Sequence, residues 1–182
     1  MFYIRVIVVA VFIIASLHLT LFSSFWHALF CTAFATVAVI VIDGVTAFLI
    51  RRLPERYFAP DSDFFHVGEK ERRLYRKWKI KAWKDKVPEL GCFTGFHKNK
   101  LENAHDREYL ARFLVESNYG VIIHIVNALA GFLLILLPEL LITVSLSVAM
   151  VNFVLSMMPV AVLRYNTAPL RRLYIKSLAR NA

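Results

Sequence analysis

The sequence has few of the residues that build metal sites, nucleotide sites or disulfides. Its 182 residues include only two cysteines, Cys31 in an apolar run and Cys92 in a basic segment. Because the two should face different environments, we expect no disulfide. Neither cysteine has metal-ligand spacing, and the chain has no glycine-rich phosphate loop and no Gly-x-Ser-x-Gly elbow. We therefore expect no bound metal and no bound cofactor, and nothing in the pattern indicates nucleic-acid binding.

What the sequence does contain is long apolar runs. Hydrophobic residues make up 58% of the chain, more than in an ordinary soluble domain. A helix needs roughly 18 or more apolar residues to cross about 30 Å of hydrocarbon. Four runs meet this length: 2–22, 28–50, 119–137 and 140–163. The sequence therefore predicts an all-α membrane protein, a single integral membrane domain over 1–182 with four transmembrane helices.

The first run has a second interpretation, that of a cleaved signal peptide. No strongly basic leader precedes it, and Ser23-Ser24-Phe25-Trp26 is a poor small-residue cleavage site. Since another apolar run follows almost at once, we expect an uncleaved helix.

The basic residues are distributed unevenly. Of the 22 Lys and Arg, 16 lie in 51–118 and 5 from Arg164 onward. With four spans these two regions share one side, which the positive-inside rule makes the cytoplasm. We predict a multi-pass protein of the cell membrane with both termini cytoplasmic. Orientation explains most of this charge without a ligand, but a few cations could bind anionic headgroups or phosphate, with Lys98 and Arg164 the better candidates.

The basic loop 51–118 is rich in aromatic residues, unlike a disordered linker. Within 69–86, one helical face carries apolar side chains among many lysines and arginines, typical of a helix at the membrane interface. That face consists of Leu74, Tyr75, Trp78 and Ala82. Pro88 should end the helix, and a second helix should start near Glu102 and continue into the third span. The fold prediction therefore includes cytoplasmic interfacial helices.

Polar residues inside predicted spans are costly, so each is a candidate for function. They are Asp43, His124, Asn127 and Asn152. Asp43 could serve as a proton-relay or binding carboxylate, or could lie at the headgroups and pair with Arg51 or Arg52.

A polar stripe marks the predicted third helix. Its members step by three or four: His105, Glu108, Arg112, Glu116, Gly120, His124 and Asn127. Glu116 and His124 share a face and lie about 12 Å apart along the axis at 1.5 Å per residue. They are too far apart to bond each other directly, yet both can line one cavity. The alternative is that the stripe packs against other helices and satisfies hydrogen bonds between them.

Several short motifs together resemble a known family. They are Leu53-Pro54-Glu55-Arg56-Tyr57-Phe58, Trp78 through Trp83-Lys84-Asp85-Lys86-Val87-Pro88, Phe96-His97-Lys98 with Leu101, Glu116 with His124, and Pro159 followed by Arg164-Tyr165-Asn166. Their order resembles that of the glycosyl-4,4'-diaponeurosporenoate acyltransferases, from about residue 50 to the C-terminus. Three positions differ from the family pattern: Leu163 stands where the family often has Gln, Thr167 where it often has Arg, and Val121 where it has Glu.

This resemblance implies a membrane O-acyltransferase that moves a fatty acyl group onto a hydroxyl of a lipid-linked or sugar-bearing acceptor. His124 would be the base and Glu116 would position substrate. The residues expected to bind substrate are Lys98, Arg164, Tyr165, Asn166 and Trp83. Acyl-CoA or another acyl donor would be the co-substrate, and membrane lipid and a hydrophobic acceptor would be the partners. The sequence leaves the acceptor and the oligomeric state open.

Two other classes stay open from the residues alone. The chain could be a non-enzymatic protein that binds lipid or a partner, with the polar stripe serving only helix packing. It could also be a small transporter subunit, for which Asp43 and His124 would carry the ion or proton.

Overall fold

The computed structural model describes residues 2–22, 24–87, 106–138 and 140–180. They form six α-helices, joined by short 3₁₀ turns, and no strand occurs among them. The helices are α1 (Phe2–Leu17), α2 (Phe25–Arg51), α3 (Glu69–Lys77), α4 (Ile80–Trp83), α5 (Arg107–Ala130) and α6 (Ile142–Arg180). The all-helical prediction is confirmed for this part of the chain. Residues 1–51 with 123–157 make one compact unit, and residues 52–122 with 158–182 make a second.

Within the part of the chain that the structure describes, three helices are long and apolar enough to cross a membrane. They are α2, α5 together with its 3₁₀ extension to Leu136, and α6. The described apolar helix Ile4–Leu17, which belongs to α1, is shorter. The 16 residues of α1 rise about 24 Å, short of the roughly 30 Å of a bilayer core. These helices indicate a membrane protein, while the predicted count of four spans depends on α1.

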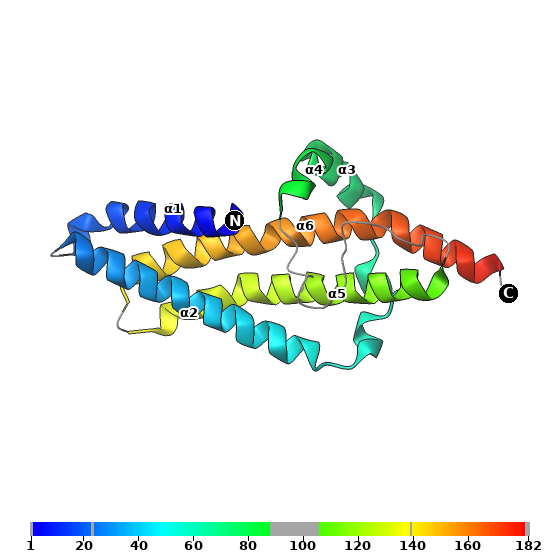
Figure 1. Ribbon diagram of the computed structural model, residues 1–182, viewed down its shortest axis with the longest axis horizontal. Helices are drawn as coiled ribbons and strands as arrows, with labels where there is room; N and C mark the ends of the chain where they lie inside the picture. Colours follow the sequence, from blue (N-terminus) through cyan, green and yellow to red (C-terminus); the bar gives the residue numbers. More distant parts are fainter. Residues whose placement is uncertain (1, 23, 88–105, 139, 181–182) are drawn as a thin grey trace. The chain divides into compact units, whose positions relative to one another are not determined.

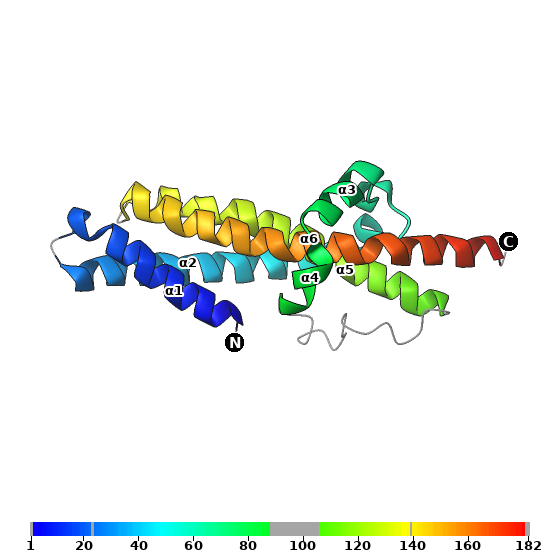
Figure 2. The same ribbon diagram turned by 90° about the horizontal axis from the view of Figure 1, so that it is seen from above.

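The first unit pairs α1 with α2 in a helical hairpin, where the two run antiparallel side by side (Figure 1, Figure 2). Small and β-branched residues of α2, among them Ala35 and Val39, pack in one apolar core with Leu134, Val144 and Val148. Large side chains on the other faces stay exposed, as is expected of helices that lie in lipid. The hydroxyl of Thr32 donates to the Ala28 carbonyl at 2.8 Å, so this buried polar group is satisfied within its own helix.

Short connections join the helices of this unit. The amide of His27 donates to Ser24 Oγ at 3.2 Å at the start of α2. After α5 the helix tightens into a 3₁₀ extension, Gly131–Leu136, and α6 begins at Ile142. The third and fourth apolar runs therefore form a hairpin, with Leu134 packed in one core with Val144 and Val148.

The helices containing the third and fourth runs are longer than the apolar stretches. Asp106 begins α5, because its Oδ1 accepts hydrogen bonds from the amides of Glu108 and Tyr109 at 2.9 and 3.3 Å. From there α5 continues without a break into the predicted span, and α6 continues past Leu163 to Arg180. Residues 102–105, where the sequence places the start of this helix, lie outside the described residues.

The second unit is held together by the polar parts of α5 and α6 and the loop after α2. Asn118 Nδ2 donates to the Phe58 carbonyl at 3.0 Å, and the Tyr119 hydroxyl donates to the Leu53 carbonyl at 2.7 Å. The Phe58 ring stacks on that of Tyr119, with centroids 3.7 Å apart. An apolar cluster joins α5 to α6: Leu110, Phe113, Leu114, Leu170 and Tyr174.

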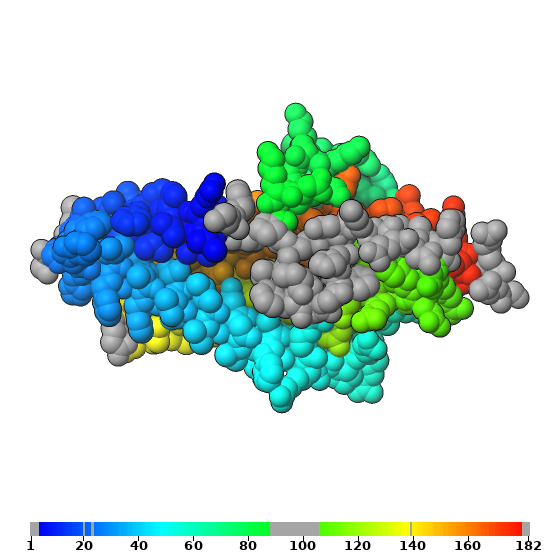
Figure 3. All heavy atoms as spheres, viewed as in Figure 1, coloured from blue at the N-terminus to red at the C-terminus, as the bar shows by residue number. Residues whose placement is uncertain are grey.

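The predicted helix over 69–86 is broken. α3 ends at Lys77, and Lys79 takes a left-handed conformation with φ 50° before α4 begins. Tyr75 is buried, whereas Leu74 and Trp78 are exposed, so the expected common face is divided. The two short helices stand out from the surface of the second unit (green in Figure 3). Pro88 lies outside the described residues.

Candidate functional site

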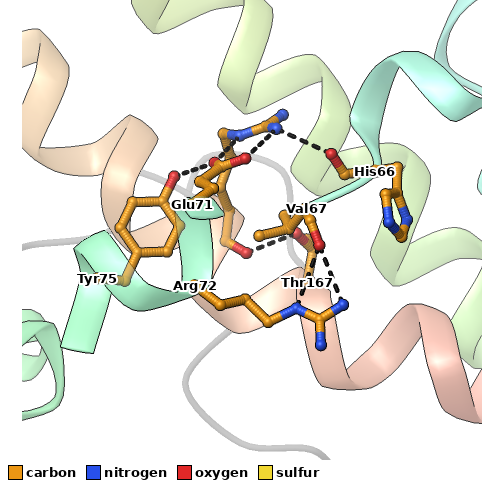
Figure 4. Close-up of polar contacts among 7 residues, drawn as sticks. His66, Val67, Glu71, Arg72, Tyr75 and Thr167 are labelled. Carbon is orange, nitrogen blue, oxygen red and sulfur yellow. Dashed lines mark hydrogen bonds and ion pairs between the residues drawn. The ribbon is translucent and has the colours of Figure 1, made fainter. Parts of the chain in front are cut away.

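An ion pair between α3 and α6 is the centre of the polar structure in the second unit. Arg164 meets Glu71 with two parallel hydrogen bonds, Nε to Oε1 at 2.5 Å and Nη2 to Oε2 at 2.9 Å (Figure 4). Arg164 Nη2 also donates to the His66 carbonyl at 3.2 Å, and the Tyr75 hydroxyl donates to Glu71 Oε1. Two-pronged guanidinium–carboxylate contacts of this kind fix orientation as well as distance. The pair therefore fixes the position of α3 against α6.

The environment of this pair controls its protonation. Burial alone would raise the pKa of Glu71, but the hydrogen bonds from Arg164 and Tyr75 outweigh it and hold that pKa below its usual value. Burial and the bond to Glu71 raise the pKa of Tyr75, so its hydroxyl stays protonated. At neutral pH the group is thus a carboxylate that accepts from a cation and a neutral phenol.

The segment that follows Arg164 adds further contacts with α3 and with Lys84, the residue after α4. The ring of Tyr165 meets that of Tyr75 edge to face, with centroids 6.5 Å apart. Asn166 Oδ1 accepts a hydrogen bond from Lys84 Nζ at 3.2 Å. Thr167 Oγ1 donates to the Arg164 carbonyl of its own helix at 3.2 Å. The motif Arg164-Tyr165-Asn166 therefore forms the α6 side of this contact.

A pocket lies in the same unit, between the loop before α3 and the helices α5 and α6. Its described lining consists of Pro60, Phe65, His66, Val67, Arg72, Leu114, Asn118, Thr167, Ala168, Arg171, Arg172 and Ile175. Arg72 donates through Nε and Nη2 to the Val67 carbonyl at 3.2 and 3.1 Å, which closes the loop onto the first turn of α3 (Figure 4). Apolar side chains and guanidinium groups thus line one hollow.

Arg171 is the most buried cation of this lining, with 8% of its surface exposed. Its Nη2 donates to the Asp61 carbonyl at 2.6 Å and to Asp63 Oδ1 at 3.2 Å. Nε and Nη1 are buried, and neither makes a hydrogen bond within the part of the chain that the structure describes. Buried N–H groups left in this way are costly, and each calls for an explanation.

Three of the five predicted substrate-binding residues lie together in the structure. Arg164, Tyr165 and Asn166 are brought together at the α3 contact, and Arg164 is already engaged by an internal carboxylate. Trp83 lies at the end of α4, where its indole donates to the Trp78 carbonyl at 3.1 Å. Lys98 lies outside the described residues.

The predicted catalytic residues both lie on α5. Glu116 and His124 are half-buried, and Val121 between them is buried with 2% of its surface exposed. Glu116 belongs to the second unit and His124 to the first. Their roles stay predictions.

A second polar group lies within the spans of the first unit. Asn152 Nδ2 donates to the Asn127 carbonyl at 3.1 Å and to Asp43 Oδ1 at 3.4 Å, and the Thr46 hydroxyl donates to Asn127 Oδ1. A Cβ on Gly131 would lie 2.8 Å from Asn152 Nδ2, so a larger residue there would force the Asn152 side chain to move. Three of the four polar span residues picked out in the sequence therefore meet, and their contacts are bonds between helices.

The sequence analysis did not identify Glu71, Tyr75 and Arg171 as residues of the site. The signal for the first two was available, since a carboxylate among cations stands four residues from a tyrosine on one helical face. Arg171 carried no such signal. Its partners Asp61 and Asp63 are more than a hundred residues away in the chain.

The described fold and the pocket define a helical membrane protein with a cationic, partly apolar hollow in its second unit. The family of glycosyl-4,4'-diaponeurosporenoate acyltransferases matches residues 54–176. That range is more than half of the chain, so the chain belongs to this family, and the resemblance seen in the motifs is confirmed. No curated protein and no solved structure matches the chain.

Proposed function

We propose that this chain is a membrane O-acyltransferase, which moves a fatty acyl group onto a hydroxyl of a lipid-linked or sugar-bearing acceptor. The observation that carries the proposal is that the family match over 54–176 contains the Glu71–Arg164 pair and every described residue of the pocket. The apolar helices α5 and α6, which border that pocket, give the acyl chain a suitable environment. Acyl-CoA or another acyl donor is the co-substrate, and membrane lipid and a hydrophobic acceptor are the partners.

The reaction needs a base and a group that stabilises the tetrahedral oxyanion. The acceptor hydroxyl oxygen bonds to the acyl carbonyl carbon, and the bond from that carbon to the donor's leaving group breaks. In our proposal His124 takes the hydroxyl proton and returns it to the leaving group, because imidazole titrates near neutral pH. Glu116 positions the acceptor on the same face of α5.

The substrate-binding roles are adjusted by the contacts already described. Arg164 is engaged by Glu71, so we assign it the positioning of α3, with Tyr165 and Asn166 completing the same contact. Trp83 supports the end of α4 next to Lys84, and we assign both to the binding of the acyl donor. We assign Lys98 the binding of the oxyanion or of the acyl donor.

A substitution of His124 tests the proposal. Membranes containing the full chain are given radiolabelled palmitoyl-CoA, and the acylated lipids are separated and identified by mass spectrometry. His124→Ala should lower the rate of acyl transfer about a hundredfold or more, as expected for loss of a general base. His27→Ala is the matched control, since His27 is exposed and lies outside the residues that match the family.

The outcomes separate the function from the role of the residue. Full activity in His124→Ala would remove the base assignment. Lipid that copurifies with the wild-type chain, without any acyl product, would instead support the lipid-binding alternative. A glycolipid acylated only in cells that contain the chain identifies the acceptor.

A further inference from the structure

We propose that the pocket lined by Arg72, Arg171 and Arg172 binds a phosphate group carried by an amphiphilic molecule. The inference rests on the proposed function for one point only, the source of the phosphate. An acyl donor such as acyl-CoA and a lipid headgroup both present this chemistry.

Arg171 is the first argument. Its guanidinium is buried, and two of its nitrogens make no hydrogen bond within the described chain. Within the described residues its carboxylate partner is Asp63, whose side chain is fully exposed to solvent. Burying a cation without a buried counterion costs free energy, and an anion bound beside the cation removes that cost.

The charge of the lining is the second argument. Three arginines and His66 line the pocket, and none of the described lining residues is acidic. Carboxylates pair with two of these arginines: Asp63 with Arg171, and Glu69 with Arg72, whose Nη1 lies 3.4 Å away. Both side chains are more than half exposed, so solvent weakens their fields. Several guanidinium groups around one hollow suit phosphate, because its oxygens can accept hydrogen bonds from the N–H groups of more than one arginine.

The apolar part of the lining selects the kind of phosphate. Phe65, Val67 and Leu114 are buried or nearly so and face the same hollow as the arginines. Inorganic phosphate would gain nothing from these side chains. A phosphate ester with an apolar portion gains from both parts of the pocket.

The test measures binding by the purified full chain in dodecyl maltoside, a detergent without phosphate. Coenzyme A and a short-chain phosphatidic acid are titrated calorimetrically, with pantetheine as the phosphate-free counterpart of coenzyme A. Arg172→Gln is the main variant, because Arg172 lines the pocket yet is exposed, so its loss should not prevent folding. Lys176→Gln is the matched control, which removes one charge from an exposed position one turn further along α6, outside the lining.

We expect at least one phosphate probe to bind, and Arg172→Gln to weaken that binding about tenfold, as for one charge-assisted hydrogen bond. Lys176→Gln should change it less than about twofold. Binding of coenzyme A alone identifies the donor as the source, and binding of phosphatidic acid alone identifies the headgroup. Either result supports the phosphate site.

The proposal is overturned if neither phosphate probe binds more tightly than pantetheine, or if Lys176→Gln weakens binding as much as Arg172→Gln. Its fate is separate from that of the acyl transfer, because the titration needs no acceptor and no turnover. Specific binding without any acyl transfer would leave the pocket assigned and the enzyme proposal wrong. Acyl transfer without phosphate binding would support the enzyme proposal and show that the pocket is not a phosphate site.

Discussion

At the scale of single residues, the contact of Glu71 with Arg164 gives the sharpest stability prediction. Both side chains are mostly buried, so Glu71→Gln leaves a guanidinium without its counterion. We expect a loss of about 2 kcal/mol in the free energy of unfolding, within the range for hydrogen bonds to charged groups. Thermal unfolding in detergent measures it. Asp85→Asn is the control, because that carboxylate is exposed and lies 3.7 Å from Lys84, a contact worth little.

The same pair sets a pH dependence whose sign follows from the lowered pKa of Glu71. Its stabilisation is complete above the ordinary glutamate pKa of 4.5 and is lost as the pH falls through the lower folded value. The unfolding temperature of the wild type should therefore fall more steeply below pH 4.5 than that of Glu71→Gln. Parallel curves for the two proteins would show that the pair contributes nothing to acid stability.

At the scale of elements, the helix predicted over 69–86 shows where sequence patterns stop being informative. Periodicity found the helical residues, because apolar and basic residues recur at helical spacing. It could not find the break, since lysine has no special tendency to adopt the left-handed conformation seen at Lys79. Trp83 explains part of that geometry, because its indole bonds back to the Trp78 carbonyl at the end of α3.

This break gives an element-scale prediction. Glycine adopts φ 50° without the clash that a Cβ causes, so Lys79→Gly should stabilise the chain by about 1 kcal/mol. Lys81→Gly places glycine inside α4 instead and should destabilise it by about the same amount. Thermal unfolding of the two variants side by side is the measurement. A lower unfolding temperature for Lys79→Gly would mean that the lysine side chain itself holds the break.

At the scale of the whole molecule, the apolar runs predicted the helices well because hydropathy is a local property of the sequence. The polar first part of α5 was also predicted, whereas the polar continuation of α6 beyond Leu163 to Arg180 was not. Asp43, Asn127 and Asn152 were each found as costly residues in spans, but the hydrogen bonds between them were not predicted, since such pairings depend on how helices meet. The pocket was missed for the same reason: it needs Arg72 and Arg171 from separate helices.

The number of spans is the remaining question at this scale, and it depends on α1. If its 16 residues cross the bilayer, both termini share the side of the basic regions, which hold 21 of the 22 Lys and Arg. Green fluorescent protein fused to either end should then fluoresce, because it becomes fluorescent only inside the cell. Alkaline phosphatase fused to either end should be inactive, because it becomes active only outside. A shorter helix can cross if the bilayer thins locally, at a modest cost per ångström. An active phosphatase at the N-terminus together with a fluorescent C-terminal fusion would establish three spans and place α1 outside the bilayer core.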